Sequence, residues 1–323
     1  MDEKVLEQTG ETFELKPLEL VSGFDRLKLS ALVMKPKKDE APKGVVVLVH
    51  GMAEHKERYI PFMKFLAEHG YISIIHDHRG HGASIKEEGD LGYLYQRGDE
   101  GIVNDVVQVV QYAKARYRLP VHLFGHSMGS LIVRIYLQNH DTDIESLTIS
   151  GCVGPNSAAG AGVAIASLIG KFKGERYRSP FMNNMAFGSY NKAFPDAKSP
   201  FAWLSVNEDN VKAYEEDPLC GYNFTINGYK ALLNMVKKCY TSGLYHGQHA
   251  DLPIFFISGE DDPCRAGERG WKDAVDFMKN LGYTRVTARL MSGMRHEILN
   301  EKDNGQVLNL ILENIEEGNP KQA

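Results

Sequence analysis

Short apolar runs alternate with amphipathic stretches along much of the chain. Residues 45–49 read Val-Val-Val-Leu-Val, and such an uninterrupted β-branched run is typical of a strand buried on both faces. The predicted strands are residues 13–22, 27–34, 45–49, 72–75, 121–124, 147–150, 254–258 and 286–291. The predicted helices are residues 59–69, 101–118, 130–138, 267–281 and 306–315. This alternation predicts an α/β fold with a mostly parallel central sheet flanked by helices.

The alternation is interrupted between residues 153 and 245, where Gly, Asn, Tyr and Phe are frequent and only helical pieces can be recognised. We therefore predict a first core part at 1–152, a largely helical insertion at 153–245, called the cap below, and a second core part at 246–323. Open α/β sheets bind ligands at the carboxyl ends of their strands, so we expect the cap to lie there. Its bulky apolar residues suit a lid over an acyl chain, although each one could simply pack the cap onto the core.

A stretch without charged residues, between Glu145 and Lys171, is long enough for a membrane span. Residues 154–157 read Gly-Pro-Asn-Ser and break it, so we predict a strand followed by a short helix and no transmembrane segment. The cap has no basic amphipathic face, and we expect at most a transient contact with a membrane surface.

Composition excludes several classes of protein. The 323 residues contain 37 Lys and Arg against 42 Asp and Glu, a net charge of −5, without the basic cluster that nucleic-acid binding requires. The four cysteines are far apart and form no C-x-x-C pair, so we expect free thiols and no disulfide scaffold. Residues 1–4 read Met-Asp-Glu-Lys, which does not resemble a secretory signal, and we expect a cytoplasmic protein.

Residues 125–129 read Gly-His-Ser-Met-Gly, which matches G-x-S-x-G between a predicted strand and a predicted helix. This context is that of a nucleophile elbow, a strained turn that exposes a serine hydroxyl, and we predict Ser127 as the nucleophile. Close packing at such a turn leaves no room for side chains at Gly125 and Gly129. The alternative is a Gly/Ser loop in which Ser127 only caps a helix.

An activated serine needs an imidazole to accept its proton and a carboxylate to orient that imidazole. With a nucleophile elbow the three groups follow in the order Ser, Asp, His, and the last two lie in loops after later strands. The loop after residues 254–258 contains Asp261 and Asp262, and either one could point inward. The loop after 286–291 contains His296, the only histidine beyond Asp262, and we predict it as the base. Taken alone, His296 could be a surface-loop histidine and Asp262 a helix cap.

The strand at 45–49 is followed by His50, Gly51 and Met52. A His-Gly pair after the third strand of such a sheet precedes an oxyanion-hole amide, and the residue after the nucleophile provides the second. We predict the backbone N–H groups of Met52 and Met128 as these donors. The alternative is an ordinary turn at the end of a strand.

Residues 76–81 read His-Asp-His-Arg-Gly-His, which is close to the H-x-H-x-D-H pattern of dinuclear zinc hydrolases. Gly80 stands where that pattern has its aspartate ligand, and no later Cys or His run completes a second metal site. We therefore expect a structural turn in which Asp77 and Arg79 are hydrogen-bonding anchors.

Four segments together resemble the monoacylglycerol lipase and lysophospholipase-like group of α/β-hydrolases, serine hydrolases of the S33 aminopeptidase type. The segments are residues 50–55 with Arg58 and Tyr59, residues 77–84, residues 125–129, and residues 259–262 with 295–297. The resemblance covers about residues 15–150 and 250–315. It implies the α/β-hydrolase fold and a serine hydrolase that cleaves carboxylic esters of glycerides, lysophospholipids or similar acyl compounds, without a metal or an organic cofactor.

Two positions are informative when the sequence is compared with the family pattern. The pattern places the acid three residues after Gly259, which favours Asp262 over Asp261. It often has glycine where this chain has Ala53, so we expect the loop that carries Met52 to be set slightly differently.

The same triad serves other enzymes, because a fold does not fix the chemistry. A small-ester or aryl esterase, a thioesterase and an aminopeptidase all remain open. The aminopeptidase would need a cap carboxylate for the substrate amine, and the candidates are Glu208, Asp209, Glu215, Glu216 and Asp217. A zinc hydrolase and a non-catalytic binding protein are weaker alternatives. Acyl-chain length, head group and oligomeric state are left open by the sequence.

Overall fold

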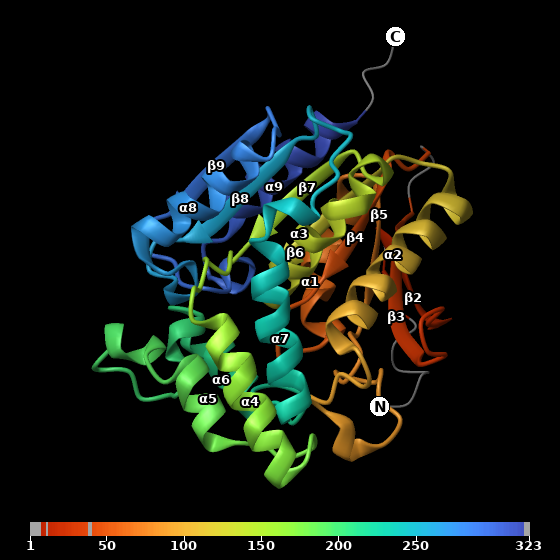
Figure 1. Cartoon of the computed structure of the whole chain (residues 1–323). Helices are drawn as coiled ribbons and strands as arrows, with labels where there is room; N and C mark the ends of the chain where they lie inside the picture. The colour runs from red at the N-terminus through yellow and green to blue at the C-terminus, as the bar shows by residue number, and fades with distance from the viewer. Residues whose placement is uncertain (1–7, 11, 38–40, 320–323) are drawn as a thin grey trace.

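A nine-stranded sheet forms the centre of the computed structural model, which describes residues 8–10, 12–37 and 41–319 (Figure 1). The strands are β1 (Gln8–Thr9), β2 (Phe13–Val21), β3 (Lys28–Pro36), β4 (Gly44–Val49), β5 (Tyr71–His76), β6 (Val121–His126), β7 (Ser146–Ser150), β8 (Ile254–Gly259) and β9 (Val286–Met291). Their order across the sheet is β1-β2-β3-β5-β4-β6-β7-β8-β9. The first three pairs in this order are antiparallel and the other five are parallel. The predicted mostly parallel sheet is confirmed.

Helices cover both faces of the sheet and create two apolar cores. One face carries α2 (Gly98–Tyr117), α3 (Met128–His140) and α8 (Gly267–Asn280), and the other carries α1 (Ile60–Glu68) and α9 (Gly305–Gly318). Strand β4 contributes side chains to both cores, because Val45 and Val47 face the first while Val46 and Leu48 face the second. This double burial explains why the strand has no polar residue.

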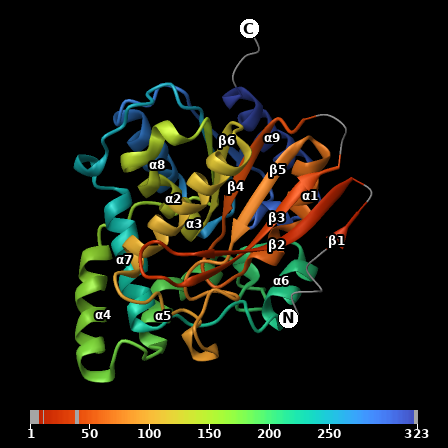
Figure 2. The ribbon, with the colours of Figure 1, turned by 90° about the vertical axis from the view of Figure 1, so that its right-hand side faces the viewer.

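Four α-helices lie between β7 and β8 in the chain: α4 (Ala159–Lys173), α5 (Pro180–Phe187), α6 (Glu208–Glu216) and α7 (Ile226–Cys239). Figure 1 shows α4, α5 and α6 at the lower end of the molecule, with α7 running from them toward the core, and Figure 2 shows α6 on the opposite side of this end from α4. Side-chain caps define two of these helices, since Ser179 accepts from Met182 N and Thr225 accepts from Gly228 N. The cap boundaries at 153 and 245 remain a prediction.

The uncharged stretch after Glu145 contains β7 and most of α4, and the residues 151–158 between them include the predicted break at 154–157. Within the described ranges, no helix combines the length and the apolar character that crossing a membrane requires.

Two local predictions differ from the structure. The helix predicted at 59–69 begins instead as a 3₁₀ turn, η2 (Lys56–Tyr59), and α1 follows it, because Pro61 suits the first turn of an α-helix. Strand β1 was not predicted, since its two residues are too few to show a periodic pattern.

Candidate active site

Ser127 occupies a strained turn between β6 and α3. Its φ of 54° and ψ of −117° lie in a region that residues other than glycine rarely adopt. A Cβ on Gly125 would lie 2.6 Å from Gly129 O, and a Cβ on Gly129 would lie 2.1 Å from Val49 O. The turn therefore requires both glycines. The Ser127 side chain makes no capping hydrogen bond to α3, which contradicts the simple helix-cap alternative.

Asp262 and His296 form a buried pair. Their carboxylate Oδ2 and imidazole Nδ1 are 2.9 Å apart, and neither side chain is more than 2% exposed. Asp262 also accepts hydrogen bonds from Ser258 Oγ at 2.9 Å and from Cys264 N at 2.8 Å. These donors fix the carboxylate so that the imidazole proton resides on Nδ1 and Nε2 is left as the proton acceptor.

The electrostatics of the pair favour its charged form. Burial alone would raise the pKa of the Asp262 carboxyl, but the His296 imidazole and the hydrogen-bond donors outweigh it and hold that pKa below its usual value. Burial alone would lower the pKa of His296, but the Asp262 charge outweighs it and raises that pKa. An imidazolium at this position is therefore stabilised.

The two carboxylates left open by the sequence are now distinguished. Asp261 is exposed, whereas Asp262 contacts His296. Asp262 also caps the 3₁₀ turn η8 (Pro263–Arg265) through Cys264 N, whereas the following helix α8 has no side-chain cap. His296 is buried and is not a surface-loop histidine.

Ser127 and His296 line the same cavity, at the carboxyl ends of β6 and β9. Within the described part of the chain no hydrogen bond joins the serine hydroxyl to the imidazole, and His296 Nε2 lies 3.8 Å from Cys264 Sγ. The Trp203 and His126 rings lie against the imidazole, with centroids 5.1 and 4.7 Å away. A bond between nucleophile and base often tightens only when substrate is present.

Met52 and Met128 also line this cavity, and neither backbone N–H donates a hydrogen bond to a described residue. Met128 is the first residue of α3, where helical amides have no partner within the helix. Ala53 has a φ of 51°, in the left-handed region that favours glycine. Its carbonyl accepts from Gly221 N and Tyr214 Oη, both at 2.9 Å, so the cap holds the loop that carries Met52.

A buried ion-pair network lies behind these loops, and the sequence reasoning missed it. Arg58 donates two hydrogen bonds of 2.7 Å to the Glu297 carboxylate and one of 2.8 Å to Glu54. Asn210 of α6 contacts both Arg58 and Glu297. Glu54 accepts from Gly51 N at 2.5 Å. The network thus connects the loops after β4 and β9 with the cap.

The turn after β5 is built on two buried ion pairs. Asp77 accepts from Lys56 Nζ at 2.6 Å, and Arg79 donates from Nε to Asp105 at 2.8 Å. Asp77 and Arg79 are therefore the anchors that the sequence predicted. The histidines of residues 76–81 pack ring against ring, and the groups of ligand atoms that converge within the described residues lie elsewhere.

The cavity has a volume of about 800 Å³ and lies between the core and the cap. Its core side contains Met52, Ser127, Met128 and His296. Apolar side chains of the cap line the opposite side: Phe187, Trp203, Leu204, Leu232, Leu233 and Val236.

The sequence profile of the family described as serine aminopeptidase, S33, matches residues 40–303. The chain belongs to this family. A probable lysophospholipase L2 of Haemophilus influenzae is 24% identical over 314 residues, covering 90% of this chain and 89% of that protein. A monoacylglycerol lipase of Mycolicibacterium smegmatis is 27% identical over 277 residues, covering 84% of this chain and 87% of that protein.

A solved structure supports the fold of this S33 family member. The crystal structure of a thermostable carboxyl esterase from Bacillus coagulans superposes with a TM-score of 0.83 at 23% identity, covering 93% of this chain and 99% of that one. At this identity the likeness shows the fold alone, which is that of the α/β-hydrolases.

The family description raises the question of an amine-binding carboxylate in the cap. None of the five candidate cap carboxylates lines the cavity, all of them being within the described residues. Asp209 pairs with Lys302, Glu216 with Lys212, and Asp217 with His55. The carboxylates that do line the cavity, Glu54 and Glu297, both pair with Arg58.

Proposed function

We propose that this S33 family member is a serine hydrolase that cleaves carboxylic esters of acyl lipids, of the monoacylglycerol or lysophospholipid type. One observation carries the proposal. The buried Asp262–His296 pair and the strained Ser127 turn meet at the wall of a cavity that is largely apolar on its cap side. The names of the lipase and lysophospholipase relatives support the same activity.

The mechanism is a two-step acyl transfer. The Ser127 hydroxyl attacks the ester carbonyl while His296 Nε2 takes its proton, and ionised Asp262 stabilises the imidazolium that forms. The backbone N–H groups of Met52 and Met128 stabilise the oxyanion. His296 then protonates the leaving alcohol and activates the water that releases the acid from Ser127.

The cavity lining favours an acyl chain over a peptide amine. Its cap side is formed mainly by apolar and aromatic side chains, which suit a hydrocarbon ligand. An aminopeptidase would hold the substrate ammonium with a carboxylate, and the two carboxylates at the wall are already paired with Arg58. We therefore prefer ester hydrolysis over aminopeptidase activity as the function.

The outer face of the cap supports a transient contact with the lipid aggregate that contains such a substrate. Large apolar residues on α4 and α5 are exposed, among them Leu168, Phe172 and Phe181. Phe172 is 76% exposed, and clustered exposed apolar residues are typical of interaction surfaces.

The activity is tested by hydrolysis of p-nitrophenyl esters from acetate to palmitate, together with a monoacylglycerol, a lysophosphatidylcholine and aminoacyl amides. The native protein and Ser127→Ala are compared under identical conditions. We expect turnover that peaks at long chains and falls about 10⁴-fold or more in the variant. A peak at acetate or butyrate would indicate a small-ester esterase instead, and turnover of amides alone would indicate an aminopeptidase.

A further inference from the structure

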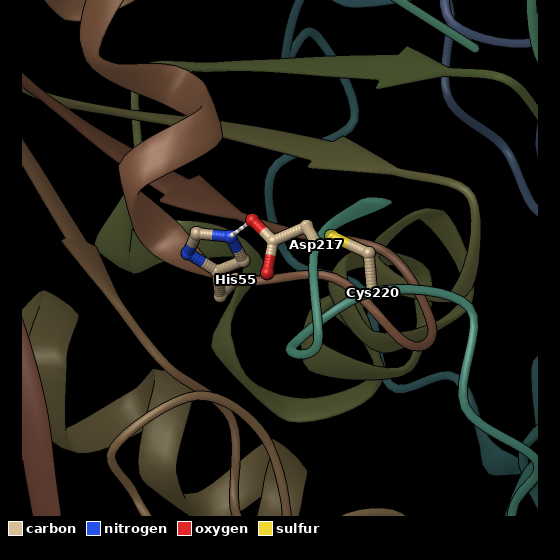
Figure 3. A group of neighbouring side chains, drawn as sticks. All are labelled: His55, Asp217 and Cys220. Carbon is tan, nitrogen blue, oxygen red and sulfur yellow. Dashed lines mark hydrogen bonds and ion pairs between the residues drawn. The ribbon is translucent and has the colours of Figure 1, made fainter. Parts of the chain in front are cut away.

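A second group of chemically reactive side chains lies at the junction between the core and the cap. His55 follows β4, whereas Asp217 and Cys220 follow α6 (Figure 3). One ligand atom from each of the three lies within 4.8 Å of the other two. In Figure 3 the Asp217 carboxylate lies between the His55 ring and the Cys220 side chain. The proposed mechanism uses none of these groups.

The His55 imidazole is oriented by a second carboxylate. Its Nδ1 lies 2.6 Å from Glu57 Oε2, and its Nε2 lies 3.0 Å from Asp217 Oδ2. Glu57 is fixed in turn by Lys56, whose Nζ is 2.9 Å away. A histidine that donates one ring N–H to a carboxylate and directs the other nitrogen at further ligands has the arrangement of metal-binding histidines.

Cys220 has a buried thiol with no hydrogen-bond partner among the described residues. The residue is 8% exposed and packs against Leu204 and Tyr214. Burial raises the pKa of this thiol, with Arg58 acting in the opposite direction. A buried sulfur next to an imidazole and a carboxylate can act as a soft metal ligand, and no hydrogen bond from the described residues competes for it.

We propose that His55, Asp217 and Cys220 bind one zinc-like divalent cation. Nitrogen and sulfur ligands favour Zn²⁺ over Mg²⁺ or Ca²⁺, which prefer sets of oxygen ligands. Ligand atoms of a tetrahedral Zn²⁺ are about 3.3–3.6 Å apart. The distance of 3.0 Å between His55 Nε2 and Asp217 Oδ2 is near this range. All three ligand atoms lie within 4.8 Å of one another, so small side-chain shifts would bring them to tetrahedral spacing. The Asp217 side chain is 31% exposed, so the group opens to solvent on the side where a water would be the fourth ligand.

Metal binding at this place would lock the cap to the oxyanion loop. Gly221 follows Cys220 and donates its N–H to the Ala53 carbonyl, next to Met52. In the absence of metal, both nitrogens of the His55 ring face carboxylates. Burial would lower the pKa of His55, but Glu57 and Asp217 outweigh it and raise that pKa. The cation must displace the proton on Nε2 and the proton of the thiol, so its affinity rises with pH.

The test uses the full chain stripped of metal with a chelator and kept reduced. Calorimetric titration with Zn²⁺ measures affinity and stoichiometry at two pH values, and Co²⁺ serves as a spectroscopic probe whose charge-transfer band reports thiolate ligation. We expect one site per chain and a cobalt–thiolate band. Cys220→Ser should abolish that band. Glu57→Gln removes the carboxylate that orients His55, together with its ion pair to Lys56, and should weaken Zn²⁺ binding about 10–100-fold.

The matched control is Cys264→Ser. Cys264 belongs to the other converging group, with Asp262 and His296, and this variant should leave both the affinity and the band unchanged. Loss of the band in Cys264→Ser, or its retention in Cys220→Ser, would overturn the proposal. So would the absence of stoichiometric Zn²⁺ binding by the native chain. Asp217→Asn provides an independent second variant, and circular dichroism verifies that each variant is folded.

Discussion

Replacement of Arg58 by alanine should destabilise the protein strongly. The substitution removes three charge-assisted hydrogen bonds of 2.7–2.8 Å and leaves the carboxylates of Glu54 and Glu297 without their cation. Both carboxylates are only 4% exposed, so water replaces the guanidinium poorly. Breaking a buried ion pair by removing one partner typically costs about 3–5 kcal/mol.

The pKa of Glu297 gives a second measure of this cost. Burial alone would raise that pKa, but Arg58 outweighs it and lowers the pKa from 4.5 to about 2. This difference corresponds to about 3–4 kcal/mol, since one pKa unit is about 1.4 kcal/mol. Because the folded pKa is depressed, this stabilisation is present above pH 4.5 and is lost as the pH falls toward 2.

The assay is equilibrium unfolding in urea at neutral pH, with ester turnover measured on the same samples. Arg285→Ala is the control, because Arg285 forms an exposed pair with Glu317 that should contribute less than about 1 kcal/mol. Adding Glu297→Gln to Arg58→Ala should recover part of the lost stability, since it removes a stranded charge. A loss of stability in Arg58→Ala no larger than that in Arg285→Ala would contradict this prediction.

Three further predictions concern packing, pH and the lipid surface. Gly129→Ala should lower the free energy of unfolding in urea by about 1–3 kcal/mol, because its Cβ would lie 2.1 Å from a backbone oxygen. Gly160→Ala is the control, since its Cβ would meet open space, and equal unfolding midpoints for the two variants would contradict the prediction. Burial lowers the pKa of His76 to about 4, so the unfolded state binds the proton first and stability should fall as pH drops from 6.5 toward 4. His76→Leu should reduce the slope of unfolding free energy against pH by up to about 1.4 kcal/mol per unit, and an unchanged slope would count against the argument. Phe172→Ser should weaken vesicle binding in a flotation assay more than Leu244→Ser does, and equal binding by both variants would disprove a lipid contact at α4.

Most of the sheet could be predicted because strands with two buried faces tolerate few polar residues. All six residues of β4 are buried between the two cores, which leaves a continuous apolar run in the sequence. The cap helices were harder to delimit. Helix α4 exposes Leu168 and Phe172, so its apolar residues do not mark one buried face, and its pattern differs from that of an ordinary surface helix.

The candidate site could be predicted where its groups follow the ends of strands. Chain order and strand ends pointed to His296 and left Asp261 and Asp262 both open, and only the family resemblance favoured Asp262. The structure brings Asp262 into contact with His296, while their catalytic role remains a prediction. The Arg58–Glu297 pair could not be found in this way. Its partners are 239 positions apart in the chain. In the sequence, either residue alone looks like an ordinary charged residue of an exposed surface.

The central claim is that Ser127 is a nucleophile activated by His296 and Asp262. The most direct measurement is labelling with a fluorophosphonate, which forms a phosphorus–oxygen bond to an activated serine and releases fluoride, followed by peptide mass spectrometry. We expect one adduct per chain, located on Ser127, absent in Ser127→Ala, and formed at least about 100-fold more slowly in Asp262→Asn. An adduct on another residue, or no adduct on the folded native protein, would contradict it.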